Sequence, residues 1–184
     1  FSMPSLECTQ CVQTRDFLEE LAGLSDKLHL EVRDFVVEAV RARLDGVDKI
    51  PATMLGDSKR LKFFGLPSGY EFATMLETMA DVSRSTTSLS AATREALKKL
   101  DRPVHIQVFV TPTCPYCPAA ARLAYQMALE SPHITADVVE INEFAYLAQR
   151  YNVRGVPRVV INEKVQFEGA LPEPQFLSHV LSAV

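Results

Sequence analysis

The sequence predicts an α/β protein built from two tandem copies of one unit, each with a central mixed four-stranded sheet flanked by helices. Three observations lead to this prediction. The four cysteines form two C-x-x-C pairs, whose first members, Cys8 and Cys114, lie 106 positions apart. Pro51 and Pro157 repeat the same interval. Within each copy, short apolar runs alternate with Ala- and Leu-rich segments, which is the pattern of an α/β fold.

The second copy, residues 84–184, shows the element order most clearly. Its β-branched run at 104–110 is typical of a buried strand, and the Ala- and Leu-rich segment after the second cysteine pair is typical of a helix. The predicted strands are 104–110, 134–141, 158–162 and 165–168, and the predicted helices are 119–130, 143–151 and 174–183. One parallel crossover and a final antiparallel hairpin complete the unit.

The first copy, residues 1–83, repeats this order. Its predicted helices are 9–22, 36–45 and 69–81, and its predicted strands are 28–35, 52–56 and 61–65. The repeat maps the first strand of the second copy onto positions before residue 1, so we expect the first unit to be truncated at its N-terminus. A polar join, Ser83 to Ser90, leads into a further helix that ends near Leu100.

Composition and charge argue against several kinds of function. The chain has 184 residues and a formal net charge of −4, and its acids and bases are interspersed, whereas nucleic-acid binding requires clustered Lys and Arg. No run approaches the roughly 18 apolar residues of a membrane span. Because every cysteine belongs to a C-x-x-C pair, long-range structural disulfides are not expected. This usage favours a reducing compartment, and we expect a cytoplasmic protein without a metal or cofactor.

A strand, a C-x-x-C at the start of a helix, a mid-unit Val-Pro or Ile-Pro, a hairpin and a last helix together resemble the thioredoxin/glutaredoxin family. Cys114-Pro-Tyr-Cys117 looks like glutaredoxin, and two units that each carry a pair resemble the protein disulfide oxidoreductases of archaea and thermophilic bacteria. The resemblance implies two tandem thioredoxin-like units in an enzyme that reduces, forms or isomerises protein disulfides. It implies that Cys114 and Cys117 are catalytic, that Cys8 and Cys11 have the same roles, and that Cys8–Cys11 and Cys114–Cys117 are redox disulfides.

The spacing of each pair suits dithiol chemistry. Residues three apart on a helix are neighbours, within the Cα separation of about 4.4–6.8 Å that a disulfide tolerates. The thiolate of Cys114, favoured at a helix N-terminus, attacks a substrate disulfide, and Cys117 then attacks the mixed disulfide and releases the product. We expect the second pair to be the more active, because its strand–turn–helix setting is complete.

The resemblance also implies a peptide-binding segment beside each pair. Cis bonds before Pro51 and Pro157 would place the backbones of Ile50 and Val156 beside the cysteines, where they could pair with an extended client. Tyr116 is expected at the rim of the second site.

The sequence departs from the family pattern in two respects. Thioredoxins carry a buried acid on the strand six residues before the first cysteine, and here those positions hold Ser2 and Val108. Glutaredoxins that bind glutathione usually have a Gly-Gly pair after the last strand, where this chain has Glu168-Gly169-Ala170. A glutathione site is therefore not expected.

The expected partners are client proteins with disulfides and, as electron donor, a flavoprotein of the thioredoxin reductase type. A second function stays open, because a dedicated electron relay between a flavoprotein disulfide reductase and a peroxiredoxin needs the same two sites. The alternatives of another class are a metal-binding module and a non-catalytic binding module. The cysteine pairs of a zinc site normally lie about 15–20 residues apart, whereas 102 residues separate Cys11 from Cys114.

Overall fold

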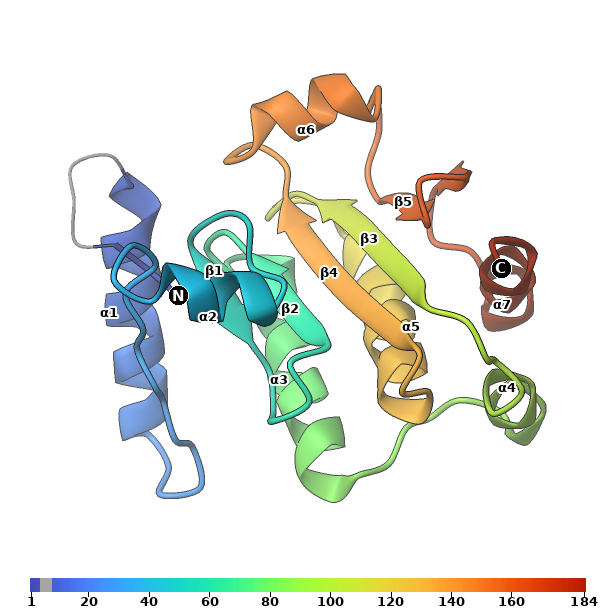
Figure 1. Ribbon diagram of the computed structural model, residues 1–184, viewed down its shortest axis with the longest axis horizontal. Coiled ribbons are helices and arrows are strands. Elements are labelled where there is room, and N and C mark those ends of the chain that lie inside the picture. The colour runs from blue at the N-terminus through green and yellow to red at the C-terminus, as the bar shows by residue number, and fades with distance from the viewer. Residues whose placement is uncertain (4–7) are drawn as a thin grey trace. The chain divides into compact units, whose positions relative to one another are not determined.

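The structure is a computed structural model that describes residues 1–3 and 8–184. It confirms the mixed α/β class (Figure 1). The helices are α1 (Thr9–Gly23), α2 (Ala39–Leu44), α3 (Tyr70–Arg84), α4 (Ala91–Leu97), α5 (Cys117–Glu130), α6 (Ala145–Arg150) and α7 (Glu173–Ser182). The strands are β1 (Ala52–Met54), β2 (Leu61–Phe64), β3 (Val104–Val110), β4 (Ile134–Glu140), β5 (Arg158–Ile161) and β6 (Val165–Glu168). Within the described ranges, no helix combines the length and the apolar character that crossing a membrane requires.

The strands form one six-stranded sheet in the order β1-β2-β4-β3-β5-β6, where the sequence predicted two sheets of four. Strand β3 pairs in parallel with β4 and antiparallel with β5, which forms a hairpin with β6. Strand β2 joins β4, because Leu61 and Phe63 are buried and the amide of Ala136 donates to the carbonyl oxygen of Arg60 over 2.8 Å. This pairing removes an exposed edge from β4.

The predicted strand at 28–35 is wrong. The segment is irregular apart from an isolated parallel bridge between Ser2 and Asp34. The amide of Ser2 donates to the carbonyl of Arg33, and the amide of Phe35 donates to the carbonyl of Ser2. A strand requires a continuous ladder of such bonds. Among the described residues the pairing here is a single bridge, so an alternating apolar pattern alone does not produce a strand.

Contacts divide the chain into two compact units, residues 1–53 with 64–67 and residues 54–63 with 68–184. The division passes through β1 and β2, so helix α3 belongs to the larger unit although it lies in the first sequence repeat. The repeat boundary between residues 83 and 84 describes the sequence pattern and stays a prediction.

The larger unit is built around β3, β4 and α5. Fully buried side chains include Ile106 from β3, Ile134 from β4, and Tyr125 and Met127 from α5. Helix α5 packs on both strands and against α3 (Figure 1). Each large apolar side chain buried in this way stabilises the fold by about 1.5–3 kcal/mol. This packing holds α3 and α5 together.

Helix α5 begins at Cys117, two residues earlier than predicted, and Pro118 lies in its first turn. Proline is tolerated there because the first amides of a helix have no partner within the helix. Pro115 lies in the turn before the helix. The first cysteine of the second pair therefore lies in the turn that joins β3 to α5.

Candidate active sites

The second cysteine pair forms a disulfide at the start of α5. The Cα atoms of Cys114 and Cys117 are 5.5 Å apart. Cys114 is 7% exposed, whereas Cys117 is completely buried. A reactant from solvent can therefore reach the sulfur of Cys114. The sulfur of Cys117 is accessible only to a group that is already bonded to the sulfur of Cys114.

Two backbone groups contact the sulfur of Cys114. The amide of Cys117, the first amide of α5, donates to this sulfur over an N–S distance of 3.1 Å, and the carbonyl oxygen of Val156 lies 3.6 Å from it. Because the first amides of a helix have no partner within the helix, this N–H is available to stabilise a thiolate after reduction.

The peptide bonds Ile50–Pro51 and Val156–Pro157 are both cis, as predicted. Both prolines are buried, whereas Ile50 and Val156 are partly exposed. In the larger unit, Val156 thus lies beside the sulfur of Cys114 and at the surface. Tyr116, between the two cysteines, has 69% of its surface exposed.

Helix α3 begins against the turn that carries the second pair. The amide of Tyr70 donates to the carbonyl oxygen of Pro112 over 3.0 Å. Arg122 on α5 forms ion pairs with Glu77 and Asp81 on α3, with N–O distances of 3.1 and 2.8 Å. Because these contacts follow one another in the same direction along both segments, α3 and α5 run parallel, and their first turns lie at the same end.

A buried carboxyl that the sequence does not single out belongs to this end of the two helices. Glu71 follows Tyr70 directly and is 1% exposed, and neither of its carboxyl oxygens has a hydrogen-bond partner among the described residues. Burial raises the pKa of Glu71 to about 7. Burial and, in second place, the charge of Glu71 also raise the pKa of Tyr125 on α5. Glu71 therefore lies in the buried layer between α3 and α5.

Sequence reasoning missed Glu71, because the family pattern places a buried acid only on the strand before each cysteine pair, where this chain has Ser2 and Val108. The carboxyl comes instead from a helix of the first repeat. Its local sequence is that of an ordinary helix start, where acidic residues are common. The preceding glycine, Gly69, was the one local signal of an unusual backbone.

Gly69 allows α3 to approach the turn of the second pair. Its φ is +60°, and a Cβ at this position would overlap the carbonyl oxygen of Pro112. Glycine is the residue that combines this backbone conformation with the absence of a side chain. The position of the first turn of α3 therefore depends on Gly69.

Replacement of Gly69 by alanine should lower the free energy of unfolding by about 2–4 kcal/mol, because strain at positive φ and the overlap with Pro112 add together. Gly169→Ala is the matched control, since Gly169 has a φ of +88° but no atom within 4 Å of its Cβ position. The control should lose only about 1–2 kcal/mol. Urea unfolding measures both, and equal losses would show that contact with Pro112 does not matter.

The first cysteine pair forms a disulfide at the start of α1. The Cα atoms of Cys8 and Cys11 are 5.3 Å apart. Cys8 is partly exposed and Cys11 is 1% exposed, so the exposure follows the order of the second pair. The amide of Cys11 donates to the carbonyl oxygen of Cys8 over 3.1 Å, whereas the equivalent amide of the second pair donates to sulfur. The two sites therefore differ in where the helix amide points.

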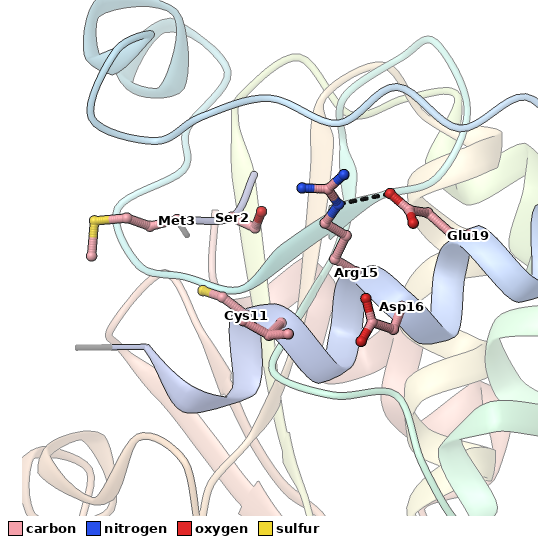
Figure 2. Close-up of a pocket in the computed structure, with 7 residues that line it drawn as sticks. Ser2, Met3, Cys11, Arg15, Asp16 and Glu19 are labelled. Carbon is pink, nitrogen blue, oxygen red and sulfur yellow. Dashed lines mark hydrogen bonds and ion pairs between the residues drawn. The ribbon is translucent and has the colours of Figure 1, made fainter. Parts of the chain in front are cut away.

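A pocket of about 130 Å³ opens beside the first pair (Figure 2). It is lined by Ser2, Met3, Cys11, Val12, Arg15, Asp16 and Glu19. Arg15 pairs with Glu19 over an N–O distance of 2.7 Å, and Figure 2 shows the sulfur of Cys11 directed toward Ser2 and Met3. The first pair therefore has neighbours of both charges, unlike the neutral turn that carries the second pair.

The cysteines do not form a metal centre in the parts of the chain that the structure describes. No group of three or more His, Cys, Asp and Glu side chains within residues 1–3 and 8–184 is arranged to hold a metal ion. Each cysteine pair is closed into its own disulfide. The four sulfurs are thus bonded in two pairs, and each disulfide can be either redox-active or structural.

Three comparisons with known proteins relate this chain to thiol–disulfide chemistry. A family model described as a thioredoxin domain matches residues 104–182. The thioredoxin of Methanocaldococcus jannaschii is 38% identical over 68 residues, which cover 36% of this chain and 80% of that protein. A protein disulfide oxidoreductase from Aeropyrum pernix superposes with a TM-score of 0.92 at 30% identity, covering 100% of this chain and 83% of that chain.

Much longer proteins also match. A component of the alkyl hydroperoxide reductase of Staphylococcus aureus is 23% identical over 166 residues, which cover 90% of this chain and 31% of that protein. The chain thus spans less than a third of this relative, and less than a third of the NADH dehydrogenase of Bacillus subtilis. The match to the Aeropyrum pernix protein reaches 30% identity and extends over most of both chains, and the chain therefore belongs to the thioredoxin-fold family of protein disulfide oxidoreductases.

Proposed function

We propose that the chain is a thiol–disulfide oxidoreductase that reduces, forms or isomerises protein disulfides at Cys114 and Cys117, with Cys8 and Cys11 as a second redox pair. The observation that carries the proposal is the asymmetry of the second pair. Cys114 is the more exposed of the two, at 7%, and its sulfur accepts a hydrogen bond from the first amide of α5, whereas Cys117 is completely buried at bonding distance. An attacking thiol and a resolving thiol require these two environments.

The reductive direction follows from these positions. The thiolate of Cys114 attacks one sulfur of a client disulfide, and the other client sulfur leaves as a thiolate. Cys117 then attacks the sulfur of Cys114, the client's remaining thiolate leaves, and the Cys114–Cys117 disulfide forms. Two electrons have passed to the client, so a donor must reduce the chain again. Because the resolving sulfur is held beside its target, the second step is effectively unimolecular.

Glu71 provides an acceptor for the proton of Cys117. A completely buried thiol must lose its proton before it attacks, and solvent does not reach it. A carboxyl with a pKa of about 7 accepts and returns a proton with little free-energy cost near neutral pH. Glu71 lies in the first turn of α3, next to Tyr70, whose amide contacts the turn that carries the second pair, and this position suits the role.

The segments Ile50–Pro51 and Val156–Pro157 would bind the client backbone. In the second site, the carbonyl oxygen of Val156 lies 3.6 Å from the sulfur of Cys114, so an extended peptide whose cysteine reacts at Cys114 passes this backbone. Tyr116 contributes an exposed aromatic surface at the rim. We assign the equivalent role in the first site to Ile50 and Pro51 by the repeat.

A second candidate function is electron relay from a flavoprotein disulfide reductase to a peroxiredoxin. The match that favours it is the one to the alkyl hydroperoxide reductase component, which covers 90% of this chain. In either function we propose a flavoprotein of the thioredoxin reductase type as the electron donor. We place the protein in the cytoplasm, because its cysteines all lie in exchangeable pairs that a reducing compartment keeps active.

The test of the proposed function is insulin reduction with dithiothreitol. The wild-type protein should accelerate insulin precipitation at catalytic concentrations, and a variant with all four cysteines changed to serine should give only the background rate. Equal rates for the two proteins would reject thiol–disulfide exchange as the function. Coupled reactions separate the candidates: the relay predicts faster NAD(P)H oxidation when a peroxiredoxin and its peroxide are added, whereas general reduction requires only insulin.

A further inference from the structure

Two of the five tyrosines are exposed close to Cys114. Tyr116 lies between the two cysteines, and Tyr70 is the first residue of α3, with 53% of its surface exposed. Tyrosine is enriched where proteins bind other proteins, because it combines a large apolar ring with a polar end. The role of Tyr116 at the rim is part of the proposed function, whereas Tyr70 has no role in it.

The backbone holds Tyr70 beside the second pair. Its amide donates to the carbonyl oxygen of Pro112, two residues before Cys114. Gly69 has no side chain and so allows this approach. Tyr70 therefore emerges next to the turn that presents Cys114, and it cannot move away while this hydrogen bond is intact.

The turn that carries Cys114 is neutral. Residues 111–116, TPTCPY, contain no charged side chain. Two arginines of the larger unit are paired with carboxylates, Arg122 with Glu77 and Asp81 and Arg158 with Glu168. Arg154 donates to the neutral amide oxygen of Asn152. The charges of Arg122 and Arg158 are thus already compensated, whereas an apolar client segment at the turn can contact two aromatic rings.

We infer that Tyr70 is a specificity-determining residue of the second site and that, together with Tyr116, it selects client disulfides flanked by apolar or aromatic side chains. This inference rests on the proposed function, because it requires client disulfides to react at Cys114. Exposed rings at Tyr116, within the turn, and at Tyr70, whose amide is bonded to the turn, can cover apolar client residues and remove their surface from water. Carboxylate-bearing disulfides gain nothing from these rings and lose hydration.

Two synthetic peptides with the same intramolecular disulfide test the assignment, one with Phe and Leu beside the cysteines and the other with Glu. Hydroxyethyl disulfide serves as a small neutral substrate that does not reach the rim. The wild-type protein should prefer the apolar peptide about tenfold in kcat/KM. Tyr70→Ala should lower kcat/KM for this peptide about fivefold to tenfold and leave that for hydroxyethyl disulfide unchanged, whereas Tyr70→Phe should retain the preference.

The matched control is Leu76→Ala, which removes an exposed apolar side chain from the same helix, about 9 Å further along its axis. It should leave the preference unchanged. Tyr70→Lys provides a second variant and should shift the preference toward the Glu peptide. If the wild-type protein reduces none of the three substrates, the proposed function itself is rejected. Full wild-type activity with an unchanged preference in both Tyr70→Ala and Tyr70→Lys, or an equal effect of Leu76→Ala, would reject only the role of Tyr70.

Discussion

Replacement of Cys114 by serine is expected to lower the rate of insulin reduction by about 100-fold or more, whereas replacement of Cys8 is expected to lower it by about threefold or less. Serine is nearly isosteric, but its hydroxyl is not ionised at neutral pH and cannot form the mixed disulfide. The difference between the sites follows from the helix amides. The amide of Cys117 donates to the sulfur of Cys114, whereas the amide of Cys11 donates to the carbonyl of Cys8, so we expect more thiolate at Cys114.

Cys117→Ser provides the complementary experiment. Cys114 should still attack the client, but no resolving thiol is present, so the mixed disulfide should accumulate on a non-reducing gel and should be identified by mass spectrometry. Cys8→Ser and Cys11→Ser should not trap the client to a comparable extent. If Cys8→Ser abolishes turnover as completely as Cys114→Ser, electrons must pass through both pairs, and the ranking of the sites is wrong. Full activity of Cys114→Ser would remove the mechanism.

The parts of the fold that depend on local residue identity could be predicted from the sequence. The interval shared by Cys8 and Cys114 and by Pro51 and Pro157, together with the family resemblance that these residues carry, predicted two disulfide pairs and two cis prolines, and the structure has both. The strand predicted at 28–35 failed, because a strand also needs a partner along its length. The six-stranded sheet could not be predicted from the repeat, because each copy alone is compatible with its own sheet.

Glu71 shows why the buried side of the site could not be predicted. Its burial results from the parallel packing of α3 on α5 and from the contact of Tyr70 with Pro112, and these segments are far apart in the chain. Residue types alone do not distinguish a buried glutamate in the first turn of a helix from an exposed one. The repeat could not help either, since Glu71 belongs to the first repeat, whereas Pro112, which its neighbour Tyr70 contacts, belongs to the second.

The stability of the wild-type protein should fall by about 3 kcal/mol through Glu71 as the pH rises from about 4.5 past 7. The pKa of this carboxyl is about 7 in the folded chain, above its usual value of 4.5, because burial disfavours the charge. Between these two values the folded state binds more protons than the unfolded state, so the free energy of unfolding decreases with pH, by about 1.4 kcal/mol per unit of pKa difference. The full stability is present below about pH 4.5, and the loss is complete above about pH 7.

Glu71→Gln should remove this part of the pH dependence, because the amide stays neutral. At pH 8 the variant should be more stable than the wild type by about 1–3 kcal/mol, the lower figure allowing for the unpartnered amide hydrogens. Urea unfolding between pH 4.5 and 8.5 measures the difference between the two proteins and so cancels the contribution of other groups. Glu77→Gln on the same helix is the control, since that side chain is 63% exposed, and it should follow the wild-type curve.

Glu71→Gln should also impair catalysis. This effect distinguishes a Glu71 that accepts a proton in the reaction from a Glu71 that is buried without a catalytic role. Without the Glu71 carboxylate as proton acceptor, the attack of Cys117 on a preformed mixed disulfide should slow about 100-fold near neutral pH, whereas formation of the mixed disulfide by Cys114 should be nearly unchanged. Stopped-flow release of a fluorescent client measures the two steps separately. A variant that gained stability above pH 7 and kept its release rate would show that Glu71 is buried without a catalytic role. A gain in stability together with slow release would mean that the buried charge of Glu71 destabilises the fold and that Cys117 requires this carboxylate as its proton acceptor.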